Sequence, residues 1–487
     1  MSSMIGIGIG IPFRRMGAGI DAQAQAHYDR VIADGGLIPS GLVGVNNFFT
    51  TVKAIYGTSD ITTAISVGLD AQVLGYKLGA GAGTTAGQAA QKLYSCSGSS
   101  GDVEQTTASS QPLLLVHSGA NYWWGSGVDG NHLTTPTSTA NSNNGNKEII
   151  AQVDCQGTAF YTFASKNNQA YCFFLLNGVF RFNATTDLLG LTQYSATASV
   201  ATNFSGWVKC TAEFSTGILT VKFFTSADGV TYTQIGSNVT GVGNNFINTG
   251  GTLYVGSING GSDFRGRIHR VTIANSVNGA PVVDFNPNTY NAANSQTQWV
   301  STSGETWTIN TGTAATGYKG ALVSKTIVQG DGIDDRLTSN VIRTNILTQY
   351  LAANPFTNDN SGNSVLIDAN NGAWLNSIVA FSSNIGNIMN SFASDLLRSR
   401  TPNRLILATS LNNEGVRNSI SVNNGAETLN TYSPCPSGNG LNIFSRSGGG
   451  TFGNAIINTY ISTIGQNNST IRTAMYNYIR SINNNAF

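Results

Sequence analysis

The chain has 487 residues, enough for about two to four domains that each bury a core. Charged residues make up only 10% of it, whereas 40% are hydrophobic and 9% aromatic, which excludes a disordered chain. The 25 basic and 24 acidic residues leave a net charge of +1 and form no basic stripe, so we expect no nucleic-acid partner. The composition predicts a globular, β-rich protein.

The cysteines and the apolar segments bear on where the protein is made. Five cysteines occur without a CxxC pair, which favours buried free thiols in a protein that folds in a reducing cytoplasm. The arginines near the amino terminus follow the first apolar stretch, whereas a secretory signal carries its positive charge in front. No segment approaches the roughly 18 consecutive apolar residues of a membrane span. We expect neither membrane insertion nor classical secretion.

Residues 1–20 predict a docking segment. Isoleucines alternate with glycines there, so an extended strand has isoleucine on one face and bare backbone on the other. A partner can approach bare backbone closely and add such a strand to its own sheet. The candidate docking residues are Ile5, Ile7, Ile9, Ile11, Phe13, Arg14 and Arg15. The alternative is a frayed chain end.

Residues 21–95 predict a small region of helices and linker. Apolar residues recur at helical spacing over 21–34 and again over 40–57, where Gly57 is a suitable stop. A passage rich in glycine, alanine and threonine follows at 79–87. One more helix is expected at 468–482, packed outside the last domain.

From about residue 110 the pattern changes to period two, which predicts strands. Short β-branched and aromatic runs bounded by Gly, Asn and Ser occupy 148–153, 217–224, 252–256, 403–409 and 418–423. Residues 225–232 contain the Asp-Gly turn of a hairpin. The motif VDGNHL at 128–133 returns about 200 residues later as GDGIDDRL at 330–337. The sequence therefore predicts two tandem antiparallel β-sandwiches, at 96–285 and 286–487.

These motifs resemble those of laminin-G/concanavalin-like jelly rolls, which are common in tailed-bacteriophage structural proteins. GDGIDDRL resembles the start signature of that family, and GSINGGSDFRGRI at 256–268 resembles its closing hairpin, with a degraded copy at 444–456. The lead-in at 92–114 and the GIGIGIPF start are similar to segments of phage virion proteins. The resemblance covers roughly residues 92–487.

The resemblance implies a virion protein of the tail-fibre or head-fibre type, made in the host bacterial cytoplasm. Its partners would be other virion proteins and further copies of itself, with a trimer favoured, and it would contact host surface polysaccharide. The alternative is a bacterial extracellular lectin-like or polysaccharide-processing protein, which an export signal or a pair of carboxylates at strand spacing would favour.

Three aspartates are candidate metal ligands. Asp331, Asp334 and Asp335 can place oxygens around a calcium ion, as some laminin-G-like domains do. The alternative is that they accept backbone N–H groups in a tight turn. In the first copy of the motif Asn131 and His132 replace the paired aspartates, so no metal is expected there.

Tyr122, Trp123 and Trp124 are the candidate glycan contacts. Sugar rings stack on exposed aromatic side chains, and this is the densest aromatic cluster of the chain. In a strand the two tryptophans face opposite ways, so at most one is exposed. The alternative is packing in the core.

We expect no enzyme. Glycosidic cleavage requires two carboxylates across a groove, and no such pair occurs at strand spacing. The four histidines, His27, His117, His132 and His269, lie far apart in the sequence without a nucleophile motif.

Overall fold

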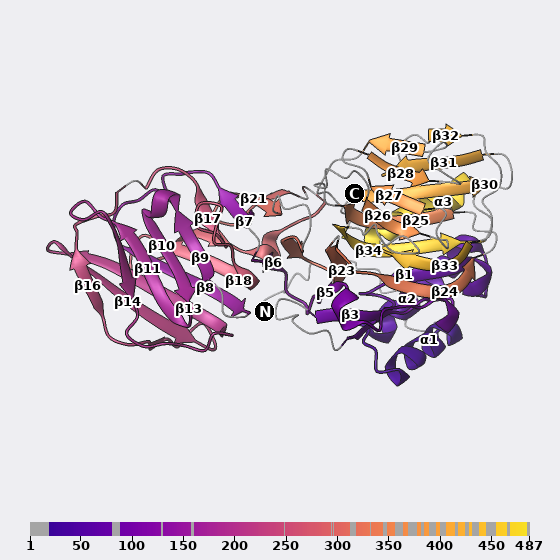
Figure 1. Ribbon diagram of the computed structural model, residues 1–487, viewed down its shortest axis with the longest axis horizontal. Helices are drawn as coiled ribbons and strands as arrows, with labels where there is room; N and C mark the ends of the chain where they lie inside the picture. The colour runs from indigo at the N-terminus through magenta and orange to yellow at the C-terminus, as the bar shows by residue number, and fades with distance from the viewer. Residues whose placement is uncertain are drawn as a thin grey trace, which may run out of the picture.

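Two lobes built from antiparallel β-sheets lie side by side in the computed structural model (Figure 1). Lobe 1 comprises residues 122–323, and lobe 2 comprises residues 19–115 together with 327–484. The fold is mainly β with a small helical N-terminal region, which confirms the predicted fold class. The structure describes residues 19–79, 88–127, 130–156, 160–247, 249–293, 295, 297–311, 318–331, 333–343, 348–355, 364–368, 377–380, 384–388, 396–399, 406–413, 417–423, 428–430, 438–444, 454–464 and 468–484.

Lobe 1 is a sandwich of two sheets, here named sheet C and sheet D. Sheet C has the order β15 (Thr233–Gln234), β14 (Ile218–Ser226), β13 (Ser205–Ser215), β8 (Lys147–Cys155), β18 (Arg265–Ala274), β6 (Tyr122–Ser126), β22 (Ala321–Val323), with β16 (Val239–Val242) beside β14 and β19 (Pro281–Phe285) beside β18. Sheet D has the order β12 (Leu191–Ser195), β11 (Val179–Thr185), β10 (Tyr171–Leu176), β9 (Phe160–Lys166), β17 (Leu253–Val255), β7 (Asn131–Thr135), β21 (Thr306–Thr311), β20 (Gln298–Val300). Alternate residues of both sheets meet in an aromatic core that includes Trp123, Phe163 and Phe223.

Lobe 2 is a second sandwich, whose sheets A and B share β3. Sheet A has the order β2 (Tyr76–Leu78), β3 (Gln88–Leu93), β4 (Val103–Glu104), β24 (Leu337–Arg343), β33 (Gly438–Ile443), β26 (Ser364–Asp368), β27 (Ser377–Ala380), β28 (Asn384–Ile388), β29 (Leu396–Ser399). Sheet B has the order β5 (Leu113–Leu115), β23 (Ile327–Asp331), β34 (Asn454–Thr463), β25 (Thr348–Pro355), β30 (Ile406–Asn413), β31 (Arg417–Val422), β32 (Thr428–Asn430), and β1 (Ile65–Asp70) pairs with the far end of β34.

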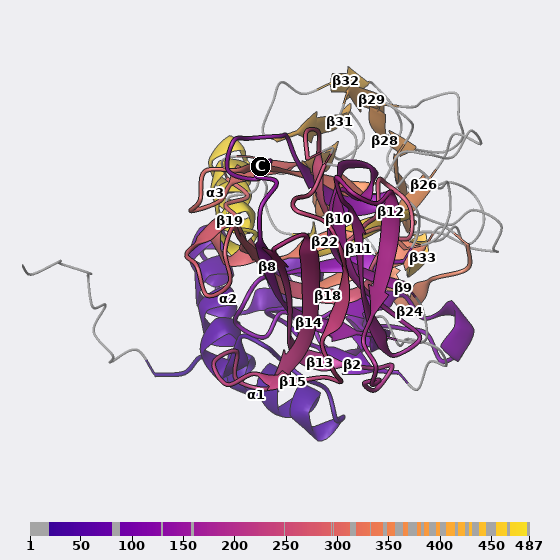
Figure 2. The same ribbon diagram turned by 90° about the vertical axis from the view of Figure 1, so that its left-hand side faces the viewer.

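Three helices cover the outer face of sheet B, as Figure 2 shows on one side of the molecule. They are α1 (Ala22–Ala33), α2 (Gly41–Tyr56) and α3 (Ser469–Ile482), so the three predicted helices are confirmed. Their apolar faces pack on side chains of β25 and β34, including Tyr350 and Ile461. Gly57 ends α2 at a φ of 65°, a conformation that favours glycine.

The strand pairings differ from the predicted domain boundaries. β20 and β21 join sheet D and β22 joins sheet C, although residues 298–323 were assigned to the second sandwich. β1 to β3, predicted as part of a helical and linker region, pair with strands of lobe 2, as do β4 and β5. Periodicity identifies a strand without identifying its partner, so the insertion of lobe 1 into lobe 2 could not be predicted from the pattern of apolar residues.

The chain passes between the lobes twice, through residues 116–121 and 324–326. The two connectors are joined to each other, because the backbone N–H of His117 donates to Oγ1 of Thr326 at 3.1 Å. Apolar side chains of both lobes close the junction around them: Leu113, Leu115, Ile327 and Ile456 of lobe 2 with Tyr122, Trp124, Ala321 and Val323 of lobe 1.

A buried ion pair holds the returning connector against lobe 2. The Lys325 ammonium lies 2.6 Å from Oδ2 of Asp70 and 3.1 Å from Oδ1 of Asn483, which follows α3. The Asp70 and Lys325 side chains are 0% and 6% exposed. Thr459 Oγ1 donates to the same Asp70 oxygen at 2.7 Å, so β1, β34, α3 and the connector meet at one carboxylate.

Candidate functional site

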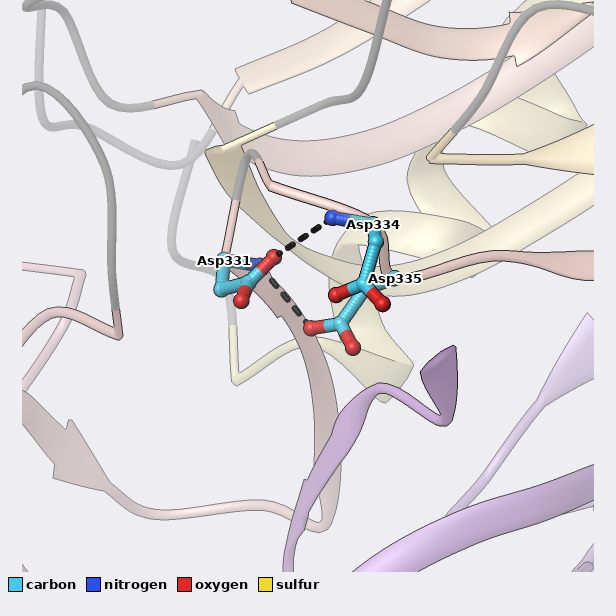
Figure 3. Close-up of side chains that lie close together, drawn as sticks. All are labelled: Asp331, Asp334 and Asp335. Carbon is cyan, nitrogen blue, oxygen red and sulfur yellow. Dashed lines mark hydrogen bonds between the residues drawn. The ribbon is translucent and has the colours of Figure 1, made fainter. Parts of the chain in front are cut away.

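The three predicted aspartates come together in the turn between β23 and β24 (Figure 3). Asp331 ends β23, and its Oδ1 accepts the N–H groups of Ile333 at 2.7 Å and Asp334 at 3.4 Å. Oδ2 of Asp335 accepts the N–H of Asp331 at 3.0 Å. These bonds are the turn geometry that the alternative interpretation predicts, and they also fix the carboxylates in place.

Oxygen atoms of all three carboxylates lie within 4.8 Å of one another. Asp335 is 1% exposed, and burial together with the negative charge of Asp331 raises its pKa to about 8. Burial likewise raises the pKa of Asp331. Among the described residues no Lys, Arg or His forms an ion pair with any of the three carboxylates, so their mutual repulsion is not offset by a protein cation.

This set of donors fits a hard cation such as calcium, which takes carboxylate, carbonyl and hydroxyl oxygens as ligands. Two hydroxyl groups border the carboxylates. Ser110 Oγ donates to Asp334 at 3.0 Å. The Tyr318 hydroxyl lies close enough to Asp335 to influence the pKa of that carboxyl. Burial and the nearby carboxylates raise the pKa of Tyr318 well above its usual value.

The aspartate cluster also connects the two lobes. Tyr318 precedes β22 in lobe 1, packs against the apolar junction and meets the ring of Trp124 with 6.4 Å between the centroids. Asp335 belongs to lobe 2. A group bound at this turn would therefore act on the contact between the lobes as well as on the turn.

The predicted glycan contacts are wrong, because all three rings are buried. Trp123 points into the core of lobe 1, and Tyr122 and Trp124 point the other way into the junction. Their exposed fractions are 1% for Tyr122 and 0% for both tryptophans. The opposite orientation of the two tryptophans was predicted correctly, but lobe 2 covers the outward ring.

Half-buried rings instead gather on the outer face of sheet C, where no glycan contact was predicted. They are Trp207 of β13, Phe224 of β14 and Tyr232 in the turn that follows β14. The Lys209 ammonium lies 5.0 Å from the Phe224 centroid and 4.3 Å from the Tyr232 centroid. The run from Trp207 to Thr211 carried a signal, because Val208 and Cys210 alternate with Lys209 and Thr211, and this spacing puts Trp207 on the outward face with the polar residues.

The remaining sequence candidates lie elsewhere. The docking residues between Ile5 and Arg15 lie outside the described residues. His269 Nε2 lies 2.9 Å from Asp154, and His132 Nδ1 lies 3.7 Å from Asp263. The four described cysteines, Cys96, Cys155, Cys172 and Cys210, are buried and free, and burial raises the pKa of each thiol. Among the described helices, none has the length and apolar character needed to cross a bilayer.

Comparison with known proteins gives weak structural likeness only. No protein-family model and no curated protein matches the chain. Among solved structures, domains LG4-5 of the mouse laminin alpha1 chain match with 13% identity over 71% of this chain and 90% of that one, at a TM-score of 0.26. The LG1-3 region of the laminin alpha2 chain matches with 9% identity over 71% of this chain and 63% of that one, at 0.27. The CBM40 of Ruminococcus gnavus IT-sialidase, bound to alpha2,3 sialyllactose, matches with 15% identity over 31% and 91%, at 0.23. TM-scores of this size carry no argument about function.

Proposed function

We propose that this chain is a non-enzymatic bacteriophage virion protein, a fibre or decoration component that attaches through its N-terminal segment. The proposal extends the motif resemblance of residues 92–487 and of the GIGIGIPF start. The observation that carries it is the insertion of lobe 1 into lobe 2. The helix that follows the docking segment, α1, packs on lobe 2, and α3 does so as well.

The insertion suggests different roles for the two lobes, with lobe 2 attached to the particle and lobe 1 projecting from it. Because the connectors lie together at one junction, lobe 1 extends to one side of lobe 2 (Figure 1). A lobe held at one end by an apolar junction and a buried ion pair is suited to project from a particle. Several copies on one particle would raise the avidity for a host glycan by roughly 10² to 10⁴ without any new contact. We infer a homo-oligomer, with a trimer favoured, as the attached form.

The aspartate turn is the site at which we propose a calcium ion. Asp331, Asp334 and Asp335 would hold it, with the role of fixing the turn and the contact with Tyr318. The proposed role is structural, in keeping with a protein that binds without cleaving. The rival function, a bacterial lectin-like or polysaccharide-processing protein, requires catalysis or export and shares the glycan contact.

Two experiments test the proposal. Cryo-electron microscopy of particles of the encoding phage should show two-lobed density on the tail or head, with lobe 2 proximal. A variant lacking residues 1–20 should fold but not enter particles, whereas normal incorporation would contradict the docking role. Release of oligosaccharides from host polysaccharide by the purified protein would overturn the non-enzymatic interpretation in favour of the rival.

A further inference from the structure

The outer face of sheet C carries half-buried side chains on several neighbouring strands, and the turn that follows β14 packs on one edge of it. Val208 and Cys210 of β13, Ile149 of β8 and Phe223 of β14 point into the core of lobe 1. Their neighbours in the strands therefore point outward. The strand register places these outward side chains in rows that cross the sheet.

One row joins an aromatic ring to two hydrogen-bonding side chains. Trp207 stands opposite Gln152 across β13 and β8, and Gln152 stands opposite Arg270 across β8 and β18. Arg270 is held by Asp284 of β19 in a forked pair, Nε to Oδ1 at 2.8 Å and Nη2 to Oδ2 at 3.0 Å. This fixes the guanidinium while 41% of the side chain stays exposed.

A second row lies next to the first. Phe224 stands opposite Lys209, and Lys209 stands opposite Ile150. Lys209 is clamped between the rings of Phe224 and Tyr232, so its ammonium is fixed rather than free to sweep across the surface. The two rows thus place half-buried rings beside positioned donors, the combination that holds a sugar by stacking and by bonds to hydroxyl groups.

The charges of this face are matched in pairs. Lys209 lies 3.8 Å from Glu148, and Lys222 lies 3.3 Å from Glu213. Arg267 of β18 stands opposite Asp154 of β8, whose carboxylate also lies 2.9 Å from His269 Nε2. Arg270 is paired with Asp284. Such a face offers no excess charge to an acidic or a basic polymer, and its rings and amide suit an uncharged polar one.

We infer that the outer face of sheet C binds an uncharged glycan chain, with Trp207 as the stacking platform and Gln152 and Arg270 as hydroxyl partners. This inference rests on the glycan contact of the proposed function and names its site and ligand class. From β14 to β19 the face spans five strands, which are separated by four interstrand spacings. At about 4.8 Å per spacing the face is about 19 Å wide, enough for several sugar units.

The test measures capture of labelled polysaccharides by the full chain attached densely to beads, because single contacts are weak. The probes are dextran, mannan and a soluble β-glucan as uncharged chains, and alginate and polygalacturonate as acidic ones. We expect capture of at least one uncharged probe and of neither acidic probe. Trp207→Ala and Gln152→Ala should each lower this capture about tenfold.

Trp207 packs on the turn at Gly229, so Trp207→Ala can disturb folding, whereas Gln152→Ala shortens a half-exposed side chain. Phe160→Ala is the matched control, because Phe160 is a half-buried ring on the outer face of sheet D, stacked 4.6 Å from Phe174. It should leave capture unchanged.

The outcomes separate this inference from the proposed function. Capture of acidic probes alone would overturn the ligand class. Uncharged capture that survives both Trp207→Ala and Gln152→Ala would overturn the site and leave the proposed glycan contact standing. Capture of no probe would overturn the inference, while incorporation into particles, measured separately, would still decide the structural role.

Discussion

The two lobes reach the same architecture by different routes along the chain. Lobe 1 is continuous, and every strand of its two sheets comes from residues 122–323. Lobe 2 is assembled from two segments, so that Ile65 of β1 pairs with Thr463 of β34 across the whole insertion. A lobe made from one segment contains all the partners of its own strands. A lobe made from two segments folds only when the inserted lobe brings the ends of those two segments together.

The lobes also differ in how they bury cations. Lobe 2 pairs Lys325 with Asp70. In lobe 1 the ammonium groups of Lys147 and Lys166 contact amide and carbonyl oxygens, such as Oδ1 of Asn141 at 2.7 Å from Lys166. Burial lowers the pKa of each of these two lysines to about 8. Removing one partner therefore has a larger electrostatic consequence in lobe 2, where a full charge is left behind.

The largest expected effect is on the ability of each lobe to fold when it is expressed alone. A fragment of residues 120–324 should unfold cooperatively by itself, because it contains all strands of sheets C and D. Residues 327–487 expressed alone should stay unfolded, because they lack β1 to β5 and the helices α1 and α2. Circular dichroism during urea titration checks both. A cooperative transition in the second fragment would show that the discontinuity of lobe 2 is unimportant.

The buried ion pair gives the next largest effect. Asp70→Ala leaves the Lys325 ammonium unpaired at 6% exposure, which should destabilise lobe 2 by about 3–5 kcal/mol. Glu213→Ala breaks the exposed pair of Lys222 in lobe 1 and should cost at most about 1 kcal/mol. Urea unfolding of the full chain measures both losses. Similar losses in the two variants would argue against burial as the cause.

These contrasts explain which features the sequence could predict. The three helices, and the strands of lobe 1, follow from local spacing, as in the alternation of Val208 and Cys210 with Lys209 and Thr211. The insertion does not, because Asp70 and Thr459 meet across 389 positions. The prediction of glycan contacts failed for the same reason, because local spacing does not identify contacts between distant segments. The period-two pattern correctly predicted that Trp124 points away from the core of lobe 1. It could not predict the side chains that cover Trp124, because these, Leu115 and Ile456 among them, come from distant segments.

Calcium should stabilise lobe 2 against unfolding and leave the stability of lobe 1 unchanged. If the aspartate turn binds the ion, calcium at a hundred times its Kd stabilises lobe 2 by about 2.7 kcal/mol. The corresponding turn of lobe 1, with Asn131 and His132, should give no such gain. Differential scanning calorimetry with and without calcium measures this, and Asp334→Asn should remove the response. Equal shifts of both transitions would point to a general salt effect.

Mild acid should weaken the helical layer of lobe 2. Burial lowers the pKa of His27 to about 4, and its Nε2 donates to the carbonyl of Leu74 at 2.8 Å. The charged groups facing it are Arg30, 3.4 Å from Nδ1, and Asp102, which pairs with Arg30. The unfolded chain takes up the proton near pH 6.5 and the folded chain only near 4, so stability is lost as the pH falls through this window.

The expected loss from this histidine is about 2 kcal/mol between pH 7 and pH 5, at 1.36 kcal/mol per pKa unit. Comparison with His27→Gln isolates it, because glutamine can still donate to Leu74 and does not titrate. Urea unfolding at both pH values provides the measurement. A variant that loses as much stability in acid as the parent chain would assign the effect to other groups.

The smallest expected effect is on the coupling between the lobes. The Tyr318 hydroxyl of lobe 1 lies beside Asp335 of lobe 2 and influences its pKa, whereas the Tyr318 ring packs on the junction beside Trp124. Tyr318→Phe keeps the ring and removes only the hydroxyl contact with Asp335. If that contact is a hydrogen bond, the coupling should fall by about 1 kcal/mol. Tyr194→Phe is the matched control, since the Tyr194 hydroxyl is buried in lobe 1 without a hydrogen-bond partner among the described residues. In calorimetry the two unfolding transitions should move apart in Tyr318→Phe and keep their spacing in Tyr194→Phe. If both variants leave the spacing unchanged, the apolar contacts of the junction carry the coupling alone, and the aspartate turn has no part in holding the lobes together.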